Sequence, residues 1–596
     1  MKKIIDKNKY CNSLTSYSRW KTREVNIGDI PLGGDNPIRV QSMTTTDTMD
    51  TIATVEQSIR MIEAGCEYVR ITAPGRKEAE NLLNIKRELN DRGYNTPLIA
   101  DIHFTPNAAQ IAARIVQKVR INPGNYADRK KFNYIEYTDE QYNLEIERIR
   151  KRFIPLIKVC KEYGTAMRIG ANHGSLSDRI LSRYGDTPNG MVESAMEFLR
   201  ICKDENYHNI VLSMKASNPI VMVQAYRLLV NKMTKESMNY PLHLGVTEAG
   251  EGEDGRIKSA LGIGTLLEDG LGDTIRVSLT EDPEYEIPVA KKIVQRYFDR
   301  NDHPELDEIK ANPINPFDYS LRETDEVLNI GGDNVPRVLV DLSSIDRVTI
   351  NILSSLGYTY FKQSDKWGIS DYACDYIYIG KTDIDFEIPG TLGVIQDFNI
   401  WINTKKHQHY PLLDINQYKE GQHFHEKLNF LNLNSSDLTN EVIEKIKNDL
   451  NIVLLLNTNN INGLADQRSM FFKLINAKIN VPVIIKRRYD NIPLSDIQLY
   501  SSTDVGGLFI DGLGDGLVVT SNKNKINSHF VDDLNKTAFG ILQATRTRIT
   551  KTEYISCPSC GRTLFDLQEV TARIRSKTQH LKGLKIGIMG CIVNGP

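Results

Sequence analysis

Short apolar runs alternate with amphipathic stretches over the first half of the chain. Eight runs rich in apolar and β-branched residues predict buried strands, at residues 38–41, 68–71, 98–101, 119–121, 166–169, 210–213, 242–246 and 274–279. Apolar residues spaced three to four apart predict helices between them, at residues 51–64, 77–89, 107–117, 191–203, 219–230 and 257–268. This alternation predicts an α/β fold, a (β/α)8 TIM barrel over residues 1–300. A doubly wound open sheet is the alternative, which a count of eight strands disfavours.

Residues 301–545 change in character and become rich in Asn, Asp, Ile and Lys. Strand-like runs remain at residues 337–341, 376–380, 392–396, 452–456 and 481–485. The peptide Asp-Gly-Leu-Gly-Asp occurs twice, at residues 269–273 and 511–515, and each copy directly precedes a predicted strand. We interpret the region as a degenerate, barrel-like copy of the first domain, although chance or a common turn could also produce one shared pentapeptide. In that register Val518 and Thr520 replace Arg276 and Ser278, so the inserted domain is predicted to be structural.

The segment 546–596 carries three clustered cysteines, Cys557, Cys560 and Cys591. A CxxC pair presents two thiolates on one turn, and a third cysteine from another loop can reach the same metal. Three thiolates suit an iron–sulfur cluster with one unusual ligand, or a zinc ion with a missing partner. So short a segment buries little core of its own, which predicts a small α+β domain stabilised by its metal.

Composition narrows the class of protein. The chain has 596 residues with 40% hydrophobic and 25% charged content, typical of a globular protein of two to four domains. A net charge of -2 does not favour nucleic-acid or membrane-surface binding. No run approaches the ~20 apolar residues of a membrane span, and the first residues lack a signal-peptide core. Eight cysteines in so long a chain do not indicate a disulfide framework, which predicts a reducing compartment, the cytoplasm.

Every predicted barrel strand ends in polar or charged residues, and a barrel builds its active site from those ends. The candidates are Arg70, Asp101, His103, Arg120, Asn122, Arg168, Asn172, Ser213, Lys215, Glu248, Arg276 and Ser278. Five are cations that would repel one another at one mouth, so we expect a substrate with several negative charges, most simply phosphates. Glu248 is the candidate acid or base, or else an anchor for the arginines; His103 could orient a phosphate or simply pack at the rim. Neither a Walker motif nor a dinucleotide fingerprint follows a strand.

Six motifs together resemble one family. They are Pro-Ile-Arg-Val-Gln-Ser-Met-Thr at 37–44, Ala-Asp-Ile-His-Phe at 100–104, Val-Arg-Ile-Asn-Pro-Gly-Asn at 119–125, Val-Thr-Glu-Ala-Gly at 246–250, Ile-Ser-Cys-Pro-Ser-Cys-Gly-Arg at 555–562 and Met-Gly-Cys-Ile-Val-Asn-Gly-Pro at 589–596. In this order they resemble the 4-hydroxy-3-methylbut-2-enyl diphosphate synthase family (IspG, also called GcpE). The inserted region is similar to the extra domain of its long, plant-type form, a second barrel without an active site.

The resemblance implies reductive ring opening of 2-C-methyl-D-erythritol 2,4-cyclodiphosphate in the methylerythritol phosphate route to isoprenoids. It also implies a 4Fe-4S cluster on the three cysteines, ferredoxin or flavodoxin as electron donor, and a proton role for Glu248. The family's fourth cluster ligand is a glutamate expected beyond residue 596, so we expect the given sequence to be truncated at its C-terminus. Monomer and homodimer both stay open. Two rival interpretations are a pterin-type barrel methyltransferase and a zinc-ribbon scaffold protein.

Overall fold

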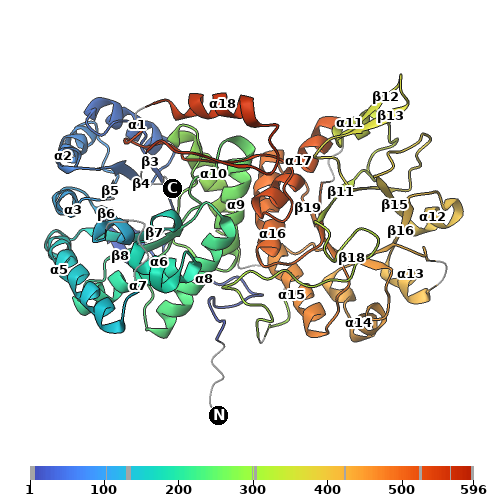
Figure 1. Ribbon diagram of the computed structural model, residues 1–596, viewed down its shortest axis with the longest axis horizontal. Coiled ribbons are helices and arrows are strands. Elements are labelled where there is room, and N and C mark those ends of the chain that lie inside the picture. The colour runs from blue at the N-terminus through green and yellow to red at the C-terminus, as the bar shows by residue number, and fades with distance from the viewer. Residues whose placement is uncertain are drawn as a thin grey trace, which may run out of the picture.

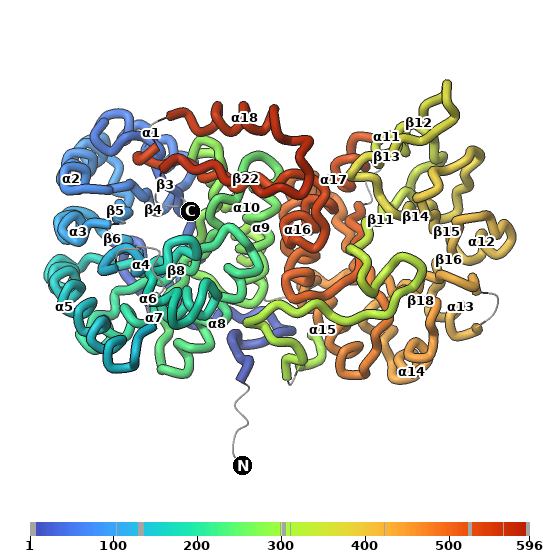
Figure 2. Tube along the Cα trace, in the orientation of Figure 1, coloured from blue at the N-terminus to red at the C-terminus, as the bar shows by residue number. Residues whose placement is uncertain are grey.

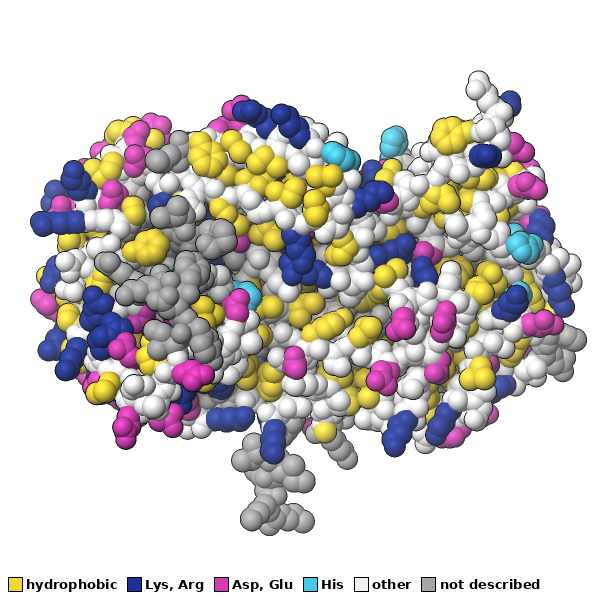
Figure 3. Space-filling view, viewed as in Figure 1, with side chains coloured by type: hydrophobic (Ala, Val, Ile, Leu, Met, Phe, Trp, Pro, Cys, Tyr) yellow, Lys and Arg dark blue, Asp and Glu magenta, His cyan; other side chains and the backbone are white. Residues whose placement is uncertain are grey.

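Two barrels lie side by side in the computed structural model, and the C-terminal segment runs from the second barrel across the top of the first (Figure 1). The structure describes residues 7–102, 104–128, 136–298, 300, 305–309, 311–421, 424–521, 527–563 and 565–591. Within these ranges no helix combines the length and the apolar content needed to cross a bilayer. Side chains of both charge signs are interspersed on the face in Figure 3, as the near-zero net charge leads one to expect.

The first barrel consists of eight parallel strands. They are β3 (Arg39–Met43), β4 (Tyr68–Thr72), β5 (Leu98–Asp101), β6 (Lys118–Ile121), β7 (Ala166–Asn172), β8 (Ile210–Lys215), β9 (His243–Leu244) and β10 (Thr274–Ile275). Their order is β8-β7-β6-β5-β4-β3-β10-β9, and a bridge between Leu212 and Leu242 joins the two ends. The TIM-barrel prediction is confirmed and the open-sheet alternative is wrong. Strands β9 and β10 are shorter than predicted, with two paired residues each.

Helices surround this barrel. They are α1 (Thr51–Glu63), α2 (Arg76–Asp91), α3 (Pro106–Ala113), α4 (Pro123–Tyr126), α5 (Asp139–Tyr163), α6 (Asp178–Tyr184), α7 (Pro188–Asp204), α8 (Pro219–Lys235), α9 (Gly252–Glu268) and α10 (Pro283–Gln295), with a 3-10 turn at His173–Ser175. All six predicted helices are present. The sequence analysis missed the short helices α4 and α6. It also missed α5 and α10, which contain Pro155 and Pro288 and so carry a signal that usually ends a helix.

A short hairpin closes the bottom of the first barrel. Its strands β1 (Val25–Ile27) and β2 (Ile30–Leu32) pair antiparallel. Their apolar side chains pack on the lowest inward residues of the barrel, which include Tyr68, Ile99 and Val211. The lumen therefore has a dry floor and opens only toward the carboxyl ends of the strands.

The second barrel is also closed and parallel, as predicted for a barrel-like copy. Its strands are β11 (Arg337–Asp341), β14 (Tyr376–Gly380), β15 (Gly393–Asp397), β16 (His409–Leu413), β17 (Asn429–Leu433), β18 (Ile452–Leu456), β19 (Val483–Arg488) and β20 (Gly516–Thr520). Its helices are α11 (Ile350–Ser355), α12 (Phe398–Thr404), α13 (Ile415–Glu420), α14 (Asn440–Ile446), α15 (Gly463–Asn476), α16 (Leu494–Ile510) and α17 (Ser528–Ala544), with a 3-10 turn at Ser435–Asp437. A hairpin of β12 (Tyr358–Phe361) and β13 (Lys366–Ile369) projects from it. The sequence analysis missed β16, which contains Pro411, and β17.

The repeated pentapeptide occupies the same place in both barrels. Thr22 donates a hydrogen bond to Asp273 over 2.9 Å, and Thr324 donates to Asp515 over 2.8 Å. The first of these aspartates also accepts from the backbone N–H of Leu242, and the second from that of Val483, both over 2.8 Å. In the ladders Thr274 pairs with Arg39, and Gly516 pairs with Arg337. The register that aligns Arg276 with Val518 is therefore confirmed.

Equivalent helices, α9 and α16, form the contact between the barrels (Figure 2). A Cβ on Gly264 would meet the Thr503 hydroxyl at 2.1 Å, so only glycine permits this approach. Beside it, two arginines and two aspartates of the repeated peptides form a buried network. Arg227 binds Asp269 over 2.8 Å and Asp511 over 2.5 Å, and Arg468 binds the same two over 2.8 and 3.1 Å.

The last segment leaves the second barrel and passes over the first. It forms β21 (Glu553–Ser556), α18 (Leu567–Thr578) and β22 (Lys585–Ile588), and the two strands pair in parallel. In Figure 1 α18 lies above the mouth of the first barrel. Lys258 on α9 holds the segment through an ion pair of 3.0 Å to Glu553. Residues 557–562 therefore face the barrel mouth of the same chain.

Candidate functional site

A pocket lies between the mouth of the first barrel and the cysteine loop. The barrel lines it with Met43, Arg70, Asp101, Arg120, Arg168, Asn172, Lys215, Thr247, Arg276 and Ser278. The C-terminal segment adds Cys557, Pro558, Ser559, Cys560, Arg562 and Cys591. All five predicted cations and all three clustered cysteines thus meet at one place. Their roles in binding and catalysis stay predictions.

The cations of this pocket are buried and poorly neutralised. Burial, helped by neighbouring arginines and opposed by the charge of Asp101, lowers the pKa of Arg70 to about 9. Burial and the surrounding arginines also hold the pKa values of Arg168 and Lys215 well below their usual range. The Nε and Nη1 atoms of Arg168 have no hydrogen-bond partner among the described residues. Such a group of donors is best satisfied by an anion with several oxygens.

Asp101 joins the barrel to the C-terminal segment. One carboxylate oxygen accepts from Arg120 over 3.2 Å and the other accepts from Arg562 over 3.4 Å. The second guanidinium nitrogen of Arg120 also donates to the carbonyl of Gly170 and to Asn172. Arg562 therefore brings a sixth cation to the mouth from the cysteine loop.

Arg276 is held in place from outside the pocket. It pairs with Glu286 on α10 over 3.3 Å, and Ser42 donates a hydrogen bond to the same carboxylate. Met43 fixes Arg70, whose Nη2 lies 2.8 Å from the methionine sulfur. These contacts orient the two arginines before any ligand arrives, which lowers the entropic cost of binding.

Gly170 leaves a small cradle in the pocket wall. A Cβ there would lie 2.8 Å from Nε of Arg120, 2.9 Å from the hydroxyl of Ser213 and 3.4 Å from Nε of Arg168. Three polar atoms therefore border a space that any side chain would fill. A phosphate oxygen or a water molecule suits that space.

The three cysteines provide soft, ionisable donors. A hydrogen bond from Cys591 and the nearby charge of Arg562 outweigh burial and lower the pKa of Cys560 to about 5. The backbone N–H of Gly590 donates to the sulfur of Cys557 over 3.3 Å, although burial raises the pKa of that thiol. This donor set fits an iron–sulfur cluster, whose ligands are thiolates stabilised by backbone N–H groups. Among the described residues, no three His, Cys, Asp or Glu side chains form a ready-made group for a single metal ion.

Glu248 lies in the interface between the barrel and the cysteine loop. It is buried, and its charge contributes to raising the pKa of Cys557. Its backbone has a φ of 54°, a left-handed conformation that is unfavourable for a residue with a Cβ. Strain of this kind is frequent where a side chain must be aimed at a reacting group.

Three other predicted residues lie outside the pocket wall or the described chain. Asn122 donates to Ser175 over 2.7 Å and caps the next helix by accepting from the N–H of Gly124. Its side chain is thus occupied by local structure. Ser213 lies behind the wall at the Gly170 cradle. His103 falls outside the described residues.

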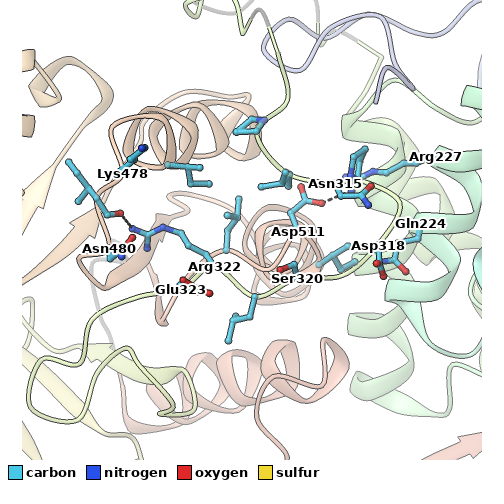
Figure 4. Close-up of a pocket in the computed structure, with 18 residues that line it drawn as sticks. Gln224, Arg227, Asn315, Asp318, Ser320, Arg322, Glu323, Lys478, Asn480 and Asp511 are labelled. Atoms are coloured by element: carbon cyan, nitrogen blue, oxygen red, sulfur yellow. Dashed lines mark hydrogen bonds and ion pairs between the residues drawn. The ribbon is translucent and has the colours of Figure 1, made fainter. Parts of the chain in front are cut away.

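A wider pocket of about 510 Å³ lies at the junction of the two barrels (Figure 4). Its two arginines are already engaged: Arg227 with Asp511, and Arg322 with the carbonyl of Ile479 over 2.6 Å. At the barrel mouth, by contrast, Nε and Nη1 of Arg168 lack partners among the described residues, and chemistry is expected there.

The sequence analysis missed several residues of the site. Arg562 follows Cys560 by two positions, and a cation so close to a CxxC pair is a usable signal. Met43 and Thr247 stand inside the quoted motifs at strand ends, but their side chains carry no charge to draw attention. Ser559 has a φ of 69° and shapes the turn between the two cysteines.

The fold and the site define a class: a TIM-barrel enzyme with a cationic mouth, which a second, cysteine-bearing domain covers. The sequence narrows this class. Residues 22–291 match the model of the GcpE TIM-barrel domain, and residues 553–596 match that of the GcpE protein C-terminal domain. The chain belongs to the GcpE family.

Curated relatives extend over nearly the whole chain. A 4-hydroxy-3-methylbut-2-en-1-yl diphosphate synthase (flavodoxin) of Parabacteroides distasonis is 52% identical over 582 residues, covering 98% of this chain and 91% of the relative. The enzyme of the same name from Leptospira interrogans is 43% identical, covering 99% and 91%. The 4-hydroxy-3-methylbut-2-en-1-yl diphosphate synthase (ferredoxin), chloroplastic, of Oryza sativa is 42% identical, covering 100% and 83%. Neither the methyltransferase nor the zinc-scaffold interpretation is supported.

Proposed function

We propose that this chain catalyses the reaction predicted from its motifs, the reductive ring opening and dehydration of 2-C-methyl-D-erythritol 2,4-cyclodiphosphate to 4-hydroxy-3-methylbut-2-enyl diphosphate. The observation that carries this proposal is the shared pocket of five barrel cations and three cysteines. A cyclic diphosphate needs several cationic donors, and a C–O bond that is cleaved reductively needs a nearby source of electrons.

In this proposal the barrel binds the diphosphate and orients it. Arg70, Arg120, Arg168, Lys215 and Arg276 hold the phosphate oxygens, and one oxygen enters the Gly170 cradle. Asn172 and Ser278 at the pocket wall supply neutral hydrogen bonds, and Asp101 keeps Arg120 and Arg562 aligned. We expect Ser213 to act from behind the cradle, and Asn122 and His103 to support the rim.

Cys557, Cys560 and Cys591 would hold a 4Fe-4S cluster, and the fourth ligand stays a predicted glutamate beyond residue 596. When bound, the cluster supplies the two electrons of the reduction one at a time, from flavodoxin or ferredoxin. Glu248 carries on its carboxylate the proton that leaves with water. Arg562 holds the cysteine loop over the bound diphosphate, so that water is excluded around the reacting carbon.

One chain contains both halves of this pocket, which supports catalysis without a partner subunit; monomer and homodimer stay the two predicted states. The cytoplasm stays the predicted compartment.

The test is anaerobic purification followed by turnover with reduced flavodoxin. We expect a brown protein with a broad absorption near ~400 nm, and loss of both colour and turnover in Cys591→Ser. A colourless protein with stoichiometric zinc would contradict the proposal.

Glu248→Gln tests the proton role separately. We expect the absorption to remain and turnover to fall by about 10² or more, because general acid–base catalysis contributes on that order. Full turnover in this variant would rule out the proton role but not the reaction.

A further inference from the structure

A lysine and a histidine are enclosed in the lumen of the first barrel, beneath the residues that line the pocket. Lys118 on β6 and His243 on β9 each have 0% exposure. Neither the lysine Nζ nor either ring nitrogen of the histidine has a hydrogen-bond partner among the described residues. Burial of unpaired donors is strongly unfavourable, so their presence in a barrel core needs an explanation.

The lysine lies between the apolar floor and the cations of the mouth. Its Nζ stands 4.9 Å from the ring centre of Tyr68, a residue of the floor, which offers it only partial compensation. Arg120, two residues further along β6, lines the pocket from the same side of the strand. Burial lowers the pKa of Lys118 well below its usual range, and the charges of Arg168 and Arg70 lower it further.

His243 experiences the same surroundings. Burial lowers its pKa well below the usual range, followed by the charges of Lys215 and Arg168, and then of Arg70 and Lys118. The two residues thus share one electrostatic environment, in which the charges that dominate are positive. A bound anion would lower the positive electrostatic potential at both residues.

The second barrel shows that the fold itself does not require these residues. In the first barrel the ladders pair Arg70 with Ile99 and Ile99 with Lys118, and in the second they pair Tyr378 with Ile395 and Ile395 with Tyr410. Tyr410 therefore stands where Lys118 stands in the first barrel.

His243 has an equally clear counterpart. It pairs with Thr274, and Ile484 pairs with Gly516 at the matching position of the last strand. Ile484 belongs to the apolar core of the second barrel. The same scaffold thus packs an aromatic and an aliphatic side chain where the first barrel buries a lysine and a histidine.

We propose that Lys118, with His243 nearby, is a positioning residue for the anion: a buried amine below Arg70 and Arg168 that carries its positive charge when a diphosphate is bound, and so strengthens binding without touching the ligand, at the expense of fold stability. Electrostatic interactions are weakly screened in a lumen without water. A positive charge one layer of side chains below the ligand therefore still attracts the anion. The empty barrel is correspondingly destabilised, and the bound anion relieves the repulsion. This inference rests on the proposed function.

The experiment compares pyrophosphate binding by calorimetry and thermal unfolding for the wild-type holoenzyme, Lys118→Met and Lys486→Met. Methionine keeps the length of the side chain and removes its charge. We expect Lys118→Met to bind pyrophosphate roughly tenfold more weakly, as one buried charge pair implies, and to unfold at a higher temperature. Lys486 lies in the lumen of the second barrel, 3.9 Å from Asp341, and its variant should bind like the wild type.

The outcomes separate the two proposals. If the wild type binds pyrophosphate and Lys118→Met binds it equally well, the inference is overturned and the proposed function stands. A lower unfolding temperature for Lys118→Met would also overturn it, since the amine would then be a satisfied core residue. If the wild type itself fails to bind pyrophosphate, the anion-binding cationic mouth of the proposed function fails, and the inference with it.

Discussion

The two barrels share one pattern of strand pairing, but at eight inward positions the polar residues of the first barrel are replaced by apolar or aromatic ones in the second, whose lumen holds a polar pair, Lys486 with Asp341. The strand ladders align eight inward positions of the two barrels. In the first barrel these positions hold Gln41, Arg70, Lys118, Arg120, Arg168, Ser213, His243 and Arg276. In the second barrel they hold, in the same order, Leu339, Tyr378, Tyr410, Leu412, Phe430, Leu455, Ile484 and Val518. The apolar set meets the packing needs of the fold, so the polar set reflects a demand other than folding. The comparison separates residues that build a barrel from residues that make it a site.

The largest expected effect comes from making the first lumen resemble the second. We expect Arg168→Met to lower kcat/KM by about 10² to 10³, because a buried charge that contacts the substrate is worth that much. The fold should keep its stability, since Nε and Nη1 of this arginine lack partners among the described residues. Steady-state turnover and thermal unfolding measure the two effects. If the activity falls only in proportion to the amount of folded protein, Arg168 serves the fold and the distinction between the two lumens is wrong.

The second barrel should instead matter to stability through its contact with the first. Asp511→Asn leaves Arg227 and Arg468 with only Asp269 as a buried carboxylate partner in their network. We expect the free energy of unfolding to fall by about 3 kcal/mol, as for other broken buried pairs. Urea denaturation measures this. Asp307→Asn is the control, because its pair with Lys473 is exposed and should contribute under about 1 kcal/mol. Equal effects of both variants would contradict a special role for the network.

A smaller, pH-dependent effect is expected at Asp504 on the same interface. Burial would raise the pKa of this carboxyl, but Arg296 from the first barrel and Arg487 from the second outweigh it and bring the pKa to about 2. A folded pKa below the unfolded one stabilises the protein above about pH 4, and the effect is lost as the pH falls toward 2.

We therefore expect Asp504→Asn to be less stable than the wild type by about 2 kcal/mol at pH 6. The difference should shrink as the pH falls from about 4 to 2, because the wild-type carboxyl then also becomes neutral. Denaturation curves across this pH range measure it. A difference that stays constant with pH would mean that packing, and not charge, holds the contact.

Much of this arrangement could be predicted from the sequence. Apolar runs with regular spacing located all eight strands of the first barrel, and the strand-end rule gathered Arg70, Arg120, Arg168, Lys215 and Arg276 before any coordinates. The shared pentapeptide revealed the second barrel. A second repeat, Gly-Gly-Asp-Asn at residues 33–36 and 331–334, would have supported it and was overlooked.

The rest could not be predicted, for physical reasons. Arg562 reaches Asp101 only because two segments separated by 461 positions meet in space. Asn122 resembles a ligand at a strand end, yet its amide is satisfied by Ser175. Lys118 stands inside an apolar strand, where a sequence cannot distinguish a solvated amine from a buried one. The role of each of these residues depends on its neighbours in the folded structure and not on its residue type.

The attachment of the cysteine segment has a kinetic consequence. Residues 557–562 reach the first barrel after leaving helix α17 of the second, which is itself fixed to the first through α9 and α16. The effective concentration of the cysteine loop at the barrel mouth is therefore always high. It is set by the length of the connecting chain and not by the concentration of the protein. Closure is a unimolecular step, so specific activity should be independent of enzyme dilution.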